Sequence, residues 1–259
     1  YFVMFILNLL LNQILVLVFI SRTMPENAKK TVLFLKPILN YGIRIYPANV
    51  MFILRIRLDQ FILAYYLEPR LLGIYTIAVF LSENLLRFPA AAQEALFPRV
   101  SSDQSQNKYQ FVARTLKMTF ILTVSLSIGL MILGYPLIWL LFGKKFLPAY
   151  PALLVLLLAI VLDGIWKIIG IFFVGTERPG LVSIFSFISA LANASFSFLL
   201  IPALGMVGAG TARFLSSLII SGLVLWLFKR ESKLKLAQIL VPDQEDYQLI
   251  KTKIVSWLT

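Results

Sequence analysis

Hydrophobic residues occupy seven long stretches of the chain, and short polar segments separate them. The stretches cover about residues 1–20, 47–67, 71–97, 115–142, 147–174, 180–201 and 207–228. An α-helix needs about 20 mostly apolar residues to cross the hydrocarbon core of a bilayer. No connection between the stretches is long enough to form a soluble domain. The pattern therefore predicts an all-α, polytopic helical membrane protein with about seven transmembrane helices.

Proline, glycine and small polar residues mark where these helices bend and meet. Pro89 lies inside the third stretch and predicts a kink there. Pro202 and Gly205 lie in the uncharged turn between the last two stretches, and small residues that allow close helix contact follow at Gly208, Ala209, Gly210 and Ala212. A polar stripe runs along the sixth stretch at three- and four-residue intervals, through Ser183, Ser186, Ser189, Asn193 and Ser197. The stripe is interpreted either as hydrogen bonding between packed helices or as the wall of a cavity.

The composition excludes several kinds of chemistry. Hydrophobic residues make up 59% of the chain and the mean hydropathy is +0.87, above the roughly 45–50% apolar content of soluble domains. The chain has no cysteine and no histidine, which rules out disulfides, thiolate metal sites and a histidine base. We therefore expect no enzyme, no catalytic residue, no metal site and no cofactor. Any proton coupling would have to use carboxylates.

Basic residues alternate between rich and poor connections, and this alternation predicts the orientation. The rich connections hold Arg22, Lys29, Lys30, Lys36 and Arg44, then Arg99, Lys108 and Arg114, and finally Lys229, Arg230, Lys233 and Lys235. Cytoplasmic loops of membrane proteins carry such an excess, so Tyr1 is expected outside and the carboxy terminus in the cytoplasm. The net charge of +12 is then explained by topology and by attraction to anionic membrane lipids. It requires no nucleic acid.

Charged residues inside the apolar stretches are the candidate functional residues. Three acid–base pairs stand four residues apart and so on one helix face: Arg55/Asp59, Glu83/Arg87 and Asp163/Lys167. Each charge costs roughly 2.5–3.5 kcal/mol at the centre of a lipid-exposed helix. These side chains are therefore expected to face protein or a water-filled cavity, as in a transporter.

Two interpretations of these charges remain open. In the first, the pairs only neutralise each other and make membrane insertion tolerable, and Arg213 extends to the membrane surface. In the second, the basic residues line a cavity and hold an anionic substrate such as a phosphate. The candidate substrate-binding or cavity residues are Arg55, Arg57, Asp59, Glu83, Arg87, Asp163, Lys167 and Arg213.

Several segments resemble the polysaccharide (O-antigen type) flippases of the MATE-like, or MOP, flippase superfamily. They are Arg57–Leu63, Leu72–Ala78, Ala95–Ser101, Phe142–Phe146, and Asn193 through Pro202 followed by Gly205–Ala212. The resemblance covers nearly all of residues 38–230. The order and spacing of the segments carry it, because each segment alone is weak.

This resemblance implies a transporter of two six-helix lobes that opens alternately to either side of the membrane. Residues 1–22 would be the last helix of the first lobe, 23–37 a cytoplasmic connector, 38–230 the second six-helix lobe, and 231–259 a cytoplasmic tail. The chain starts with Tyr1 inside an apolar stretch, so it is expected to be the back part of a longer protein.

The resemblance also implies a function. The substrate would be an undecaprenyl-pyrophosphate-linked oligosaccharide, moved across the bacterial or archaeal inner membrane for polysaccharide, lipopolysaccharide or O-antigen biosynthesis. Polysaccharide assembly proteins would be partners, and a proton or sodium gradient would drive the cycle. Arg57 and Asp59 match the family's second-lobe motif.

Other functions are considered beside the flippase. A multidrug or peptidoglycan-precursor exporter would have the same fold. A membrane glycosyltransferase or oligosaccharide polymerase would need catalytic carboxylates in a large outside loop, whereas the outside connections here are short and their only acid is Glu68. A scaffold without transport activity is the fourth alternative.

Overall fold

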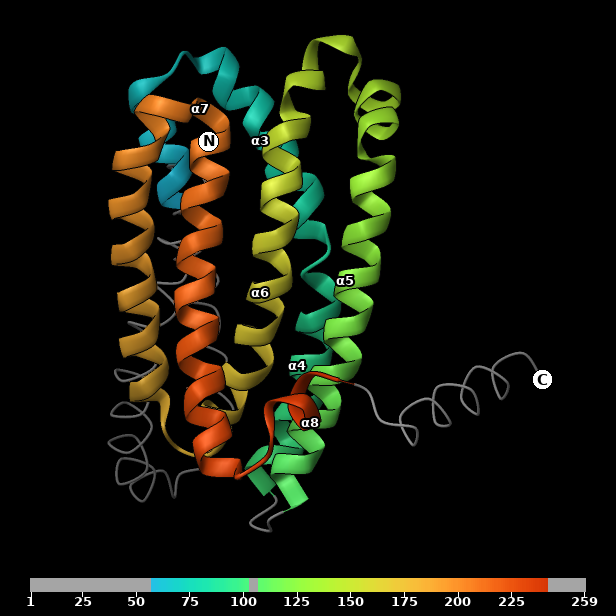
Figure 1. Cartoon of the computed structure of the whole chain (residues 1–259), viewed down its shortest axis with the longest axis vertical. Helices are drawn as coiled ribbons and strands as arrows, with labels where there is room; N and C mark the ends of the chain where they lie inside the picture. Colours follow the sequence, from blue (N-terminus) through green and yellow to red (C-terminus); the bar gives the residue numbers. More distant parts are fainter. Residues whose placement is uncertain (1–56, 103–106, 242–259) are drawn as a thin grey trace, which may run out of the picture. The chain divides into compact units, whose positions relative to one another are not determined.

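The computed structural model describes residues 57–102 and 107–241, which belong to one compact unit, Ile45–Thr259. The first expected span and the connector after it lie outside the described residues. Figure 1 shows the described helices running side by side. In chain order they are the helical residues 57–66, α3 (Pro69–Asn84), α4 (Arg87–Ser102), α5 (Asn107–Phe142), the 3₁₀ helix η2 (Lys144–Ala149), α6 (Tyr150–Gly175), α7 (Pro179–Ser232) and α8 (Leu236–Leu240).

Four of the described helical segments are long and apolar enough to cross a membrane. They are Pro69–Ser102, Lys108–Phe142, Lys144–Gly175 and Pro179–Ser232. The last of them contains a non-helical residue, Gly205, at which two helices meet. The prediction of an all-α, polytopic membrane protein is thus confirmed.

The kink predicted at Pro89 is present just before it, where α3 ends and α4 begins. Leu85 and Leu86 form a turn, and the Phe88 amide donates to the Leu85 carbonyl oxygen at 3.4 Å. Pro89 has no N–H that could donate to this carbonyl in a regular α-helix, and its ring would clash with it. The helix therefore changes direction at Leu85 and Leu86.

The reversal inside α7 depends on glycine. Gly205 has φ +58° and ψ −131°, a combination that only glycine adopts readily. Gly208 follows on the next turn, where an added Cβ atom would come within 2.2 Å of the Leu200 carbonyl oxygen. The predicted turn at 201–205 is confirmed, and the two arms of α7 approach each other closely there.

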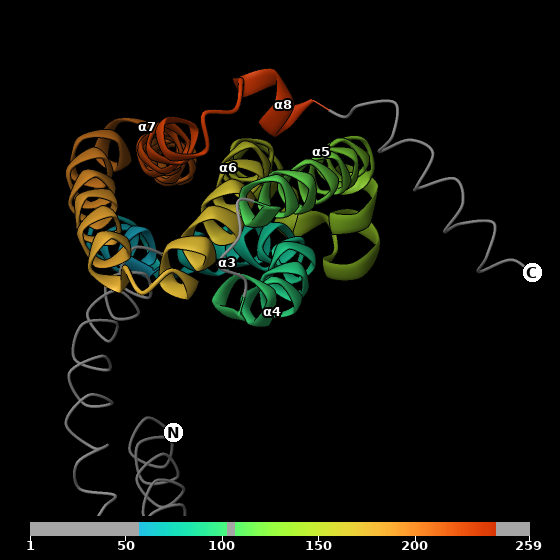
Figure 2. The same cartoon turned by 90° about the horizontal axis from the view of Figure 1, so that it is seen from below.

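Helix α6 lies at the centre of the described residues. It contacts α3, α4, α5 and α7, and Figure 2 shows it between these helices in a view along the bundle. In the most apolar part of Lys144–Gly175, 67% of the residues are buried inside the protein, against 22% in that of Lys108–Phe142. A polar residue on α6 is therefore enclosed by protein on several sides.

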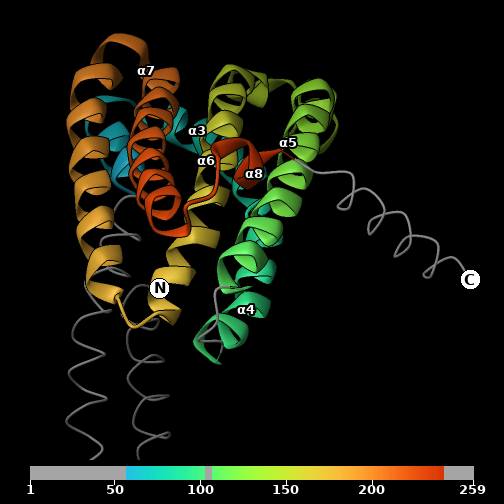
Figure 3. The same ribbon diagram turned by 60° about the horizontal axis from the view of Figure 1, so that its bottom comes forward.

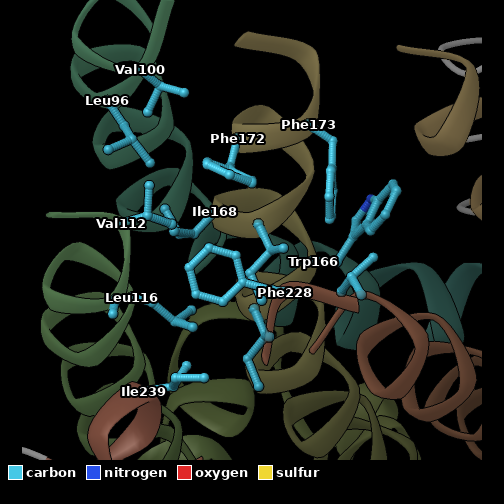
Figure 4. Close-up of a cluster of buried hydrophobic side chains, with 14 of the residues drawn as sticks. Leu96, Val100, Val112, Leu116, Trp166, Ile168, Phe172, Phe173, Phe228 and Ile239 are labelled. Atoms are coloured by element: carbon cyan, nitrogen blue, oxygen red, sulfur yellow. The ribbon is translucent and has the colours of Figure 1, made fainter. Parts of the chain in front are cut away.

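Two apolar clusters hold the helices together. Figure 4 shows the first, in which Leu96, Val112, Phe172 and Phe228 are brought together from α4, α5, α6 and α7. The rings of Phe172 and Phe228 meet edge to face, with centroids 5.3 Å apart. Helix α8 contacts α5, as Figure 3 shows, and adds the fully buried Ile239 to this cluster. The second cluster joins residues 62–63, α3 and α6.

Substituting Gly208 by Ala tests the close approach within α7. The new methyl group would overlap the Leu200 carbonyl, so we expect a loss of about 1–3 kcal/mol in stability and a lower Tm of the purified full-length protein. Gly222→Ala is the matched control, because a Cβ atom there has no neighbour within 4 Å. Equal Tm values for the two variants would contradict the close approach.

Candidate functional site

Asp59 lies at the start of the described helical residues and is fully buried. The Tyr75 hydroxyl of α3 donates to its Oδ2 atom at 2.5 Å, and the Gln60 amide donates to Oδ1 at 2.8 Å. Tyr75 is also fully buried. A carboxyl in this position cannot exchange hydrogen bonds with water, so these protein donors stabilise it.

Arg213, on the second arm of α7, is the largest fully buried side chain among the described residues. Its Nη1 atom donates to Glu83 Oε1 of α3 at 3.0 Å, and its Nη2 atom lies 3.7 Å from Asp163 Oδ2 of α6. Arg213 also interacts electrostatically with Asp59. The guanidinium thus links carboxylates of α3 and α6, with Asp59 within electrostatic range, and we call Arg213, Glu83, Asp163 and Asp59 the buried ionic cluster.

Small residues bring Arg213 close to α6. Gly210 lies three residues before it, and a Cβ atom there would come within 3.4 Å of the Ala152 carbonyl oxygen on α6. One turn after Arg213, the Ser217 hydroxyl donates to Asp163 Oδ1 at 2.7 Å. The run of small residues therefore places α7 where its arginine and serine both reach the same carboxylate.

The polar stripe of the sixth predicted span faces the other arm of α7. Ser189 donates to the Ser216 carbonyl oxygen at 3.2 Å, and Asn193 Nδ2 donates to the Ser216 hydroxyl at 3.3 Å. Both Ser189 and Asn193 are fully buried. These contacts support the interpretation of the stripe as hydrogen bonding between packed helices.

The predicted site residues fall into two groups. Asp59, Asp163 and Arg213 are buried, and the Glu83 side chain is 24% exposed; these four form the buried ionic cluster. Arg57 and Arg87 are exposed, and Lys167 is half-buried. Arg57 Nη1 reaches Gln60 Oε1 on its own helix at 3.5 Å. Arg55 lies outside the described residues.

The structure contradicts two parts of the interpretation in which the charges only neutralise each other: the surface position of Arg213 and the Glu83–Arg87 pair. Arg213 does not extend to the membrane surface, because the packed arms of α7, α6 and α3 enclose it and supply carboxylates. The Glu83–Arg87 ion pair does not form among the described residues, because the chain turns at Leu85 and Leu86 and Glu83 contacts Arg213 instead. The Asp163–Lys167 pair stays a prediction.

Sequence reasoning assigned no role to Tyr75 or Ser217, which donate to the acids of the cluster. Both lie on apolar helices at no special spacing from Asp59 or Asp163. The acids themselves stay apart: within residues 57–102 and 107–241, no three acidic side chains lie together in a way that could hold a metal ion. The arrangement separates the carboxylates around an arginine and leaves Arg57 and Arg87 exposed.

The helical arrangement is similar to part of two solved membrane transporters. The described fold is similar to a multidrug resistance MATE family transporter of the MOP superfamily in an outward-facing conformation, with a TM-score of 0.63 and 16% identity over 82% of this chain and 49% of the other. It is also similar to a MOP superfamily transporter from Pyrococcus furiosus, with a TM-score of 0.66 and 16% identity over 81% and 49%. The chain therefore spans about half the length of these structures.

Comparison of the amino-acid sequence with known proteins identifies the family of this chain. Residues 2–151 match the family described as polysaccharide biosynthesis protein, which is more than half of the chain, and the chain belongs to this family. It is also 26% identical over 163 residues to the probable low-salt glycan biosynthesis flippase Agl15 of Haloferax volcanii. That match covers 61% of this chain and 34% of the relative.

Removing the guanidinium tests the buried ionic cluster. Breaking a buried ion pair by deleting one partner costs about 3–5 kcal/mol, so Arg213→Gln should markedly lower the Tm of the full-length protein. Arg178→Gln is the control, because the Arg178–Glu231 pair has a similar atom-to-atom contact but side chains 48% and 20% exposed, and exposed pairs contribute about 0–1 kcal/mol. If both variants unfold at the wild-type temperature, Arg213 does not stabilise the fold.

Removing the Tyr75 hydroxyl tests the contact with Asp59. Tyr75→Phe leaves a buried carboxyl with one donor fewer, and we expect it to cost about 1–3 kcal/mol. Tyr65→Phe serves as the control, since Tyr65 is 81% exposed. The measurement is again the Tm, and a Tyr75→Phe protein as stable as the Tyr65→Phe protein would argue against the hydrogen bond.

Proposed function

We propose that the whole protein is a flippase that moves a lipid-linked oligosaccharide across the membrane for polysaccharide biosynthesis. Membership of the polysaccharide biosynthesis family supports the process, and the name of the Haloferax relative supports the activity. The fold supports a transporter of the MOP superfamily. These relatives are flippases and transporters rather than enzymes, which fits the absence of cysteine and histidine.

The observation that carries the proposal for this chain is the exposure of Arg57 and Arg87. Both belong to apolar helical stretches and both are exposed on the described helices. A guanidinium in lipid costs roughly 2.5–3.5 kcal/mol even on the lenient insertion scale. We infer that Arg57 and Arg87 each face either the rest of the protein or a water-filled cavity.

An exposed guanidinium in such a cavity suits a phosphorylated substrate. Arginine presents several donors in a fixed plane and binds phosphate oxygens through two hydrogen bonds at once. We assign Arg57 and Arg87 to contact with the pyrophosphate of an undecaprenyl-linked oligosaccharide. Arg213 is occupied by Glu83 and Asp163, and so it holds the helices in place rather than contacting substrate.

The lobes and the cycle are part of the same proposal. Residues 38–230 would be the second lobe of a two-lobe transporter, with residues 1–22 as the last helix of the first lobe. The lobes would open alternately to either side, with the carboxy terminus in the cytoplasm. A proton or sodium gradient would drive the cycle, and polysaccharide assembly proteins would act beside it.

The full-length protein in its own host provides the test. Arg57→Ala should reduce surface polysaccharide at least about tenfold while the protein level stays the same, because a charged hydrogen bond to phosphate contributes about 1.5–3 kcal/mol. Arg57→Lys should restore part of the output, since it keeps the charge but not the planar pair of donors. Lys229→Ala, at the exposed end of α7, should leave output unchanged.

Other results would favour a different transporter. Normal polysaccharide output from Arg57→Ala would dismiss the contact with pyrophosphate. A deletion strain with normal polysaccharide but raised drug sensitivity would favour a multidrug exporter of the same superfamily. Loss of cell-wall precursor export would favour the peptidoglycan-precursor alternative.

A further inference from the structure

A pocket of about 420 Å³ lies where residues 57–66 connect to α3, apart from the buried ionic cluster. Leu67, Leu71 and Ile74 supply its apolar floor. Arg70, Lys145 and Glu68 supply its charged groups. Lys145 comes from η2, so the pocket is built by two segments that lie far apart in the sequence.

Rigid elements form this pocket. Helices α3 and η2 contact each other, and the floor residues pack into the second apolar cluster, which also contains the fully buried Ala149 of η2. Gly143, at φ +88°, sets the start of η2, a backbone conformation that favours glycine. Packing of α3 against η2 therefore places the backbone of Lys145 relative to that of Arg70.

The charges at the pocket are not neutralised within the described part of the chain. Arg70, Lys145 and Glu68 are all exposed, and no ion pair involving them is present among residues 57–102 and 107–241. Two cations face one acid, so the balance favours an anion. Ammonium and guanidinium groups bind phosphate oxygens well.

The surroundings of the pocket indicate a ligand that also has an apolar part. Tyr66, which lines the pocket, is 42% exposed, and Tyr65, directly before it in the chain, is 81% exposed. Exposed tyrosines at the end of a span are typical of the membrane–water interface. A phosphate there would be at headgroup depth, with hydrocarbon directly beside it.

We propose that this pocket binds the phosphate of an anionic membrane lipid, with the lipid chain lying over Leu67, Leu71 and Ile74. Basic pockets between transmembrane helices bind lipid headgroups in this way. The site does not rest on flippase activity, because binding of a lipid here requires no transport. On the predicted orientation it would lie at the outer surface of the membrane.

Native mass spectrometry of the delipidated full-length protein tests the site, with phosphatidylglycerol and phosphatidylcholine as probes. The wild-type protein should retain phosphatidylglycerol in preference to phosphatidylcholine. The double variant Arg70→Ala/Lys145→Ala should bind phosphatidylglycerol about tenfold more weakly or worse, since it lacks both charged donors to the phosphate. Lys144→Ala is the matched control, because Lys144 is an exposed neighbour that does not line the pocket.

Two further probes distinguish the source of the phosphate. If a prenyl diphosphate displaces phosphatidylglycerol from the wild-type protein but not from the double variant, the pocket binds the class of lipid that a flippase would carry. If phosphatidylglycerol stays bound, the pocket binds a resident glycerophospholipid. Displacement by inorganic phosphate alone would overturn a lipid site in favour of an ordinary anion site.

The other outcomes also decide the matter. Unchanged phosphatidylglycerol binding by the double variant would overturn the proposal, and so would an equal loss in Lys144→Ala, which would indicate surface charge in general. Glu68→Gln removes the one acid and should strengthen binding. If Arg57→Ala loses polysaccharide output but still binds phosphatidylglycerol, this site is separate from the proposed flippase function. The same holds if the double variant loses lipid binding but keeps polysaccharide output.

Discussion

A guanidinium that no solvent reaches must find its hydrogen-bond acceptors in the protein, and Arg213 is in this position. Its contacts with Glu83 and Asp163 join the second arm of α7 to α3 and α6. Ser217 and the pair Asn193–Ser216 add polar contacts around it. Because a buried charge without its partner is strongly unfavourable, these three helices cannot separate far without a large cost. The buried ionic contacts therefore hold α3, α6 and α7 together within the described part of the chain.

The charged residues of the spans have two separate roles. Arg213 is enclosed and its carboxylate partners are protein groups, so it stabilises the fold. Arg57 and Arg87 are exposed on the described helices and are left for a ligand or for the rest of the protein. Under the proposed function, these exposed cations would contact the phosphate of a lipid-linked substrate.

Much of the fold could be predicted from the sequence, because span length and hydropathy are local properties. The turn at Gly205 and the kink before Pro89 were predicted for the same reason, since backbone chemistry determines both. The ion pairs were harder. Spacing of four residues points to partners on one helix, whereas Glu83 and Arg213 are 130 residues apart, and only the packing of α7 on α3 brings them together. Tyr75 lies in the Leu72–Ala78 segment, but neither its role nor that of Ser217 could be predicted, because it depends on which carboxylate the folded chain places beside each hydroxyl.

The order of residues along the chain has a consequence for how the protein is made. Glu83 and Asp163 leave the ribosome before Arg213 does, so two acids are synthesised ahead of the guanidinium that contacts them. Helix α7 completes the charge balance of helices synthesised earlier, and a nascent chain halted before α7 lacks its arginine. Quality control that detects unsatisfied acids in the bilayer would thus distinguish chains that contain α7 from chains halted before it.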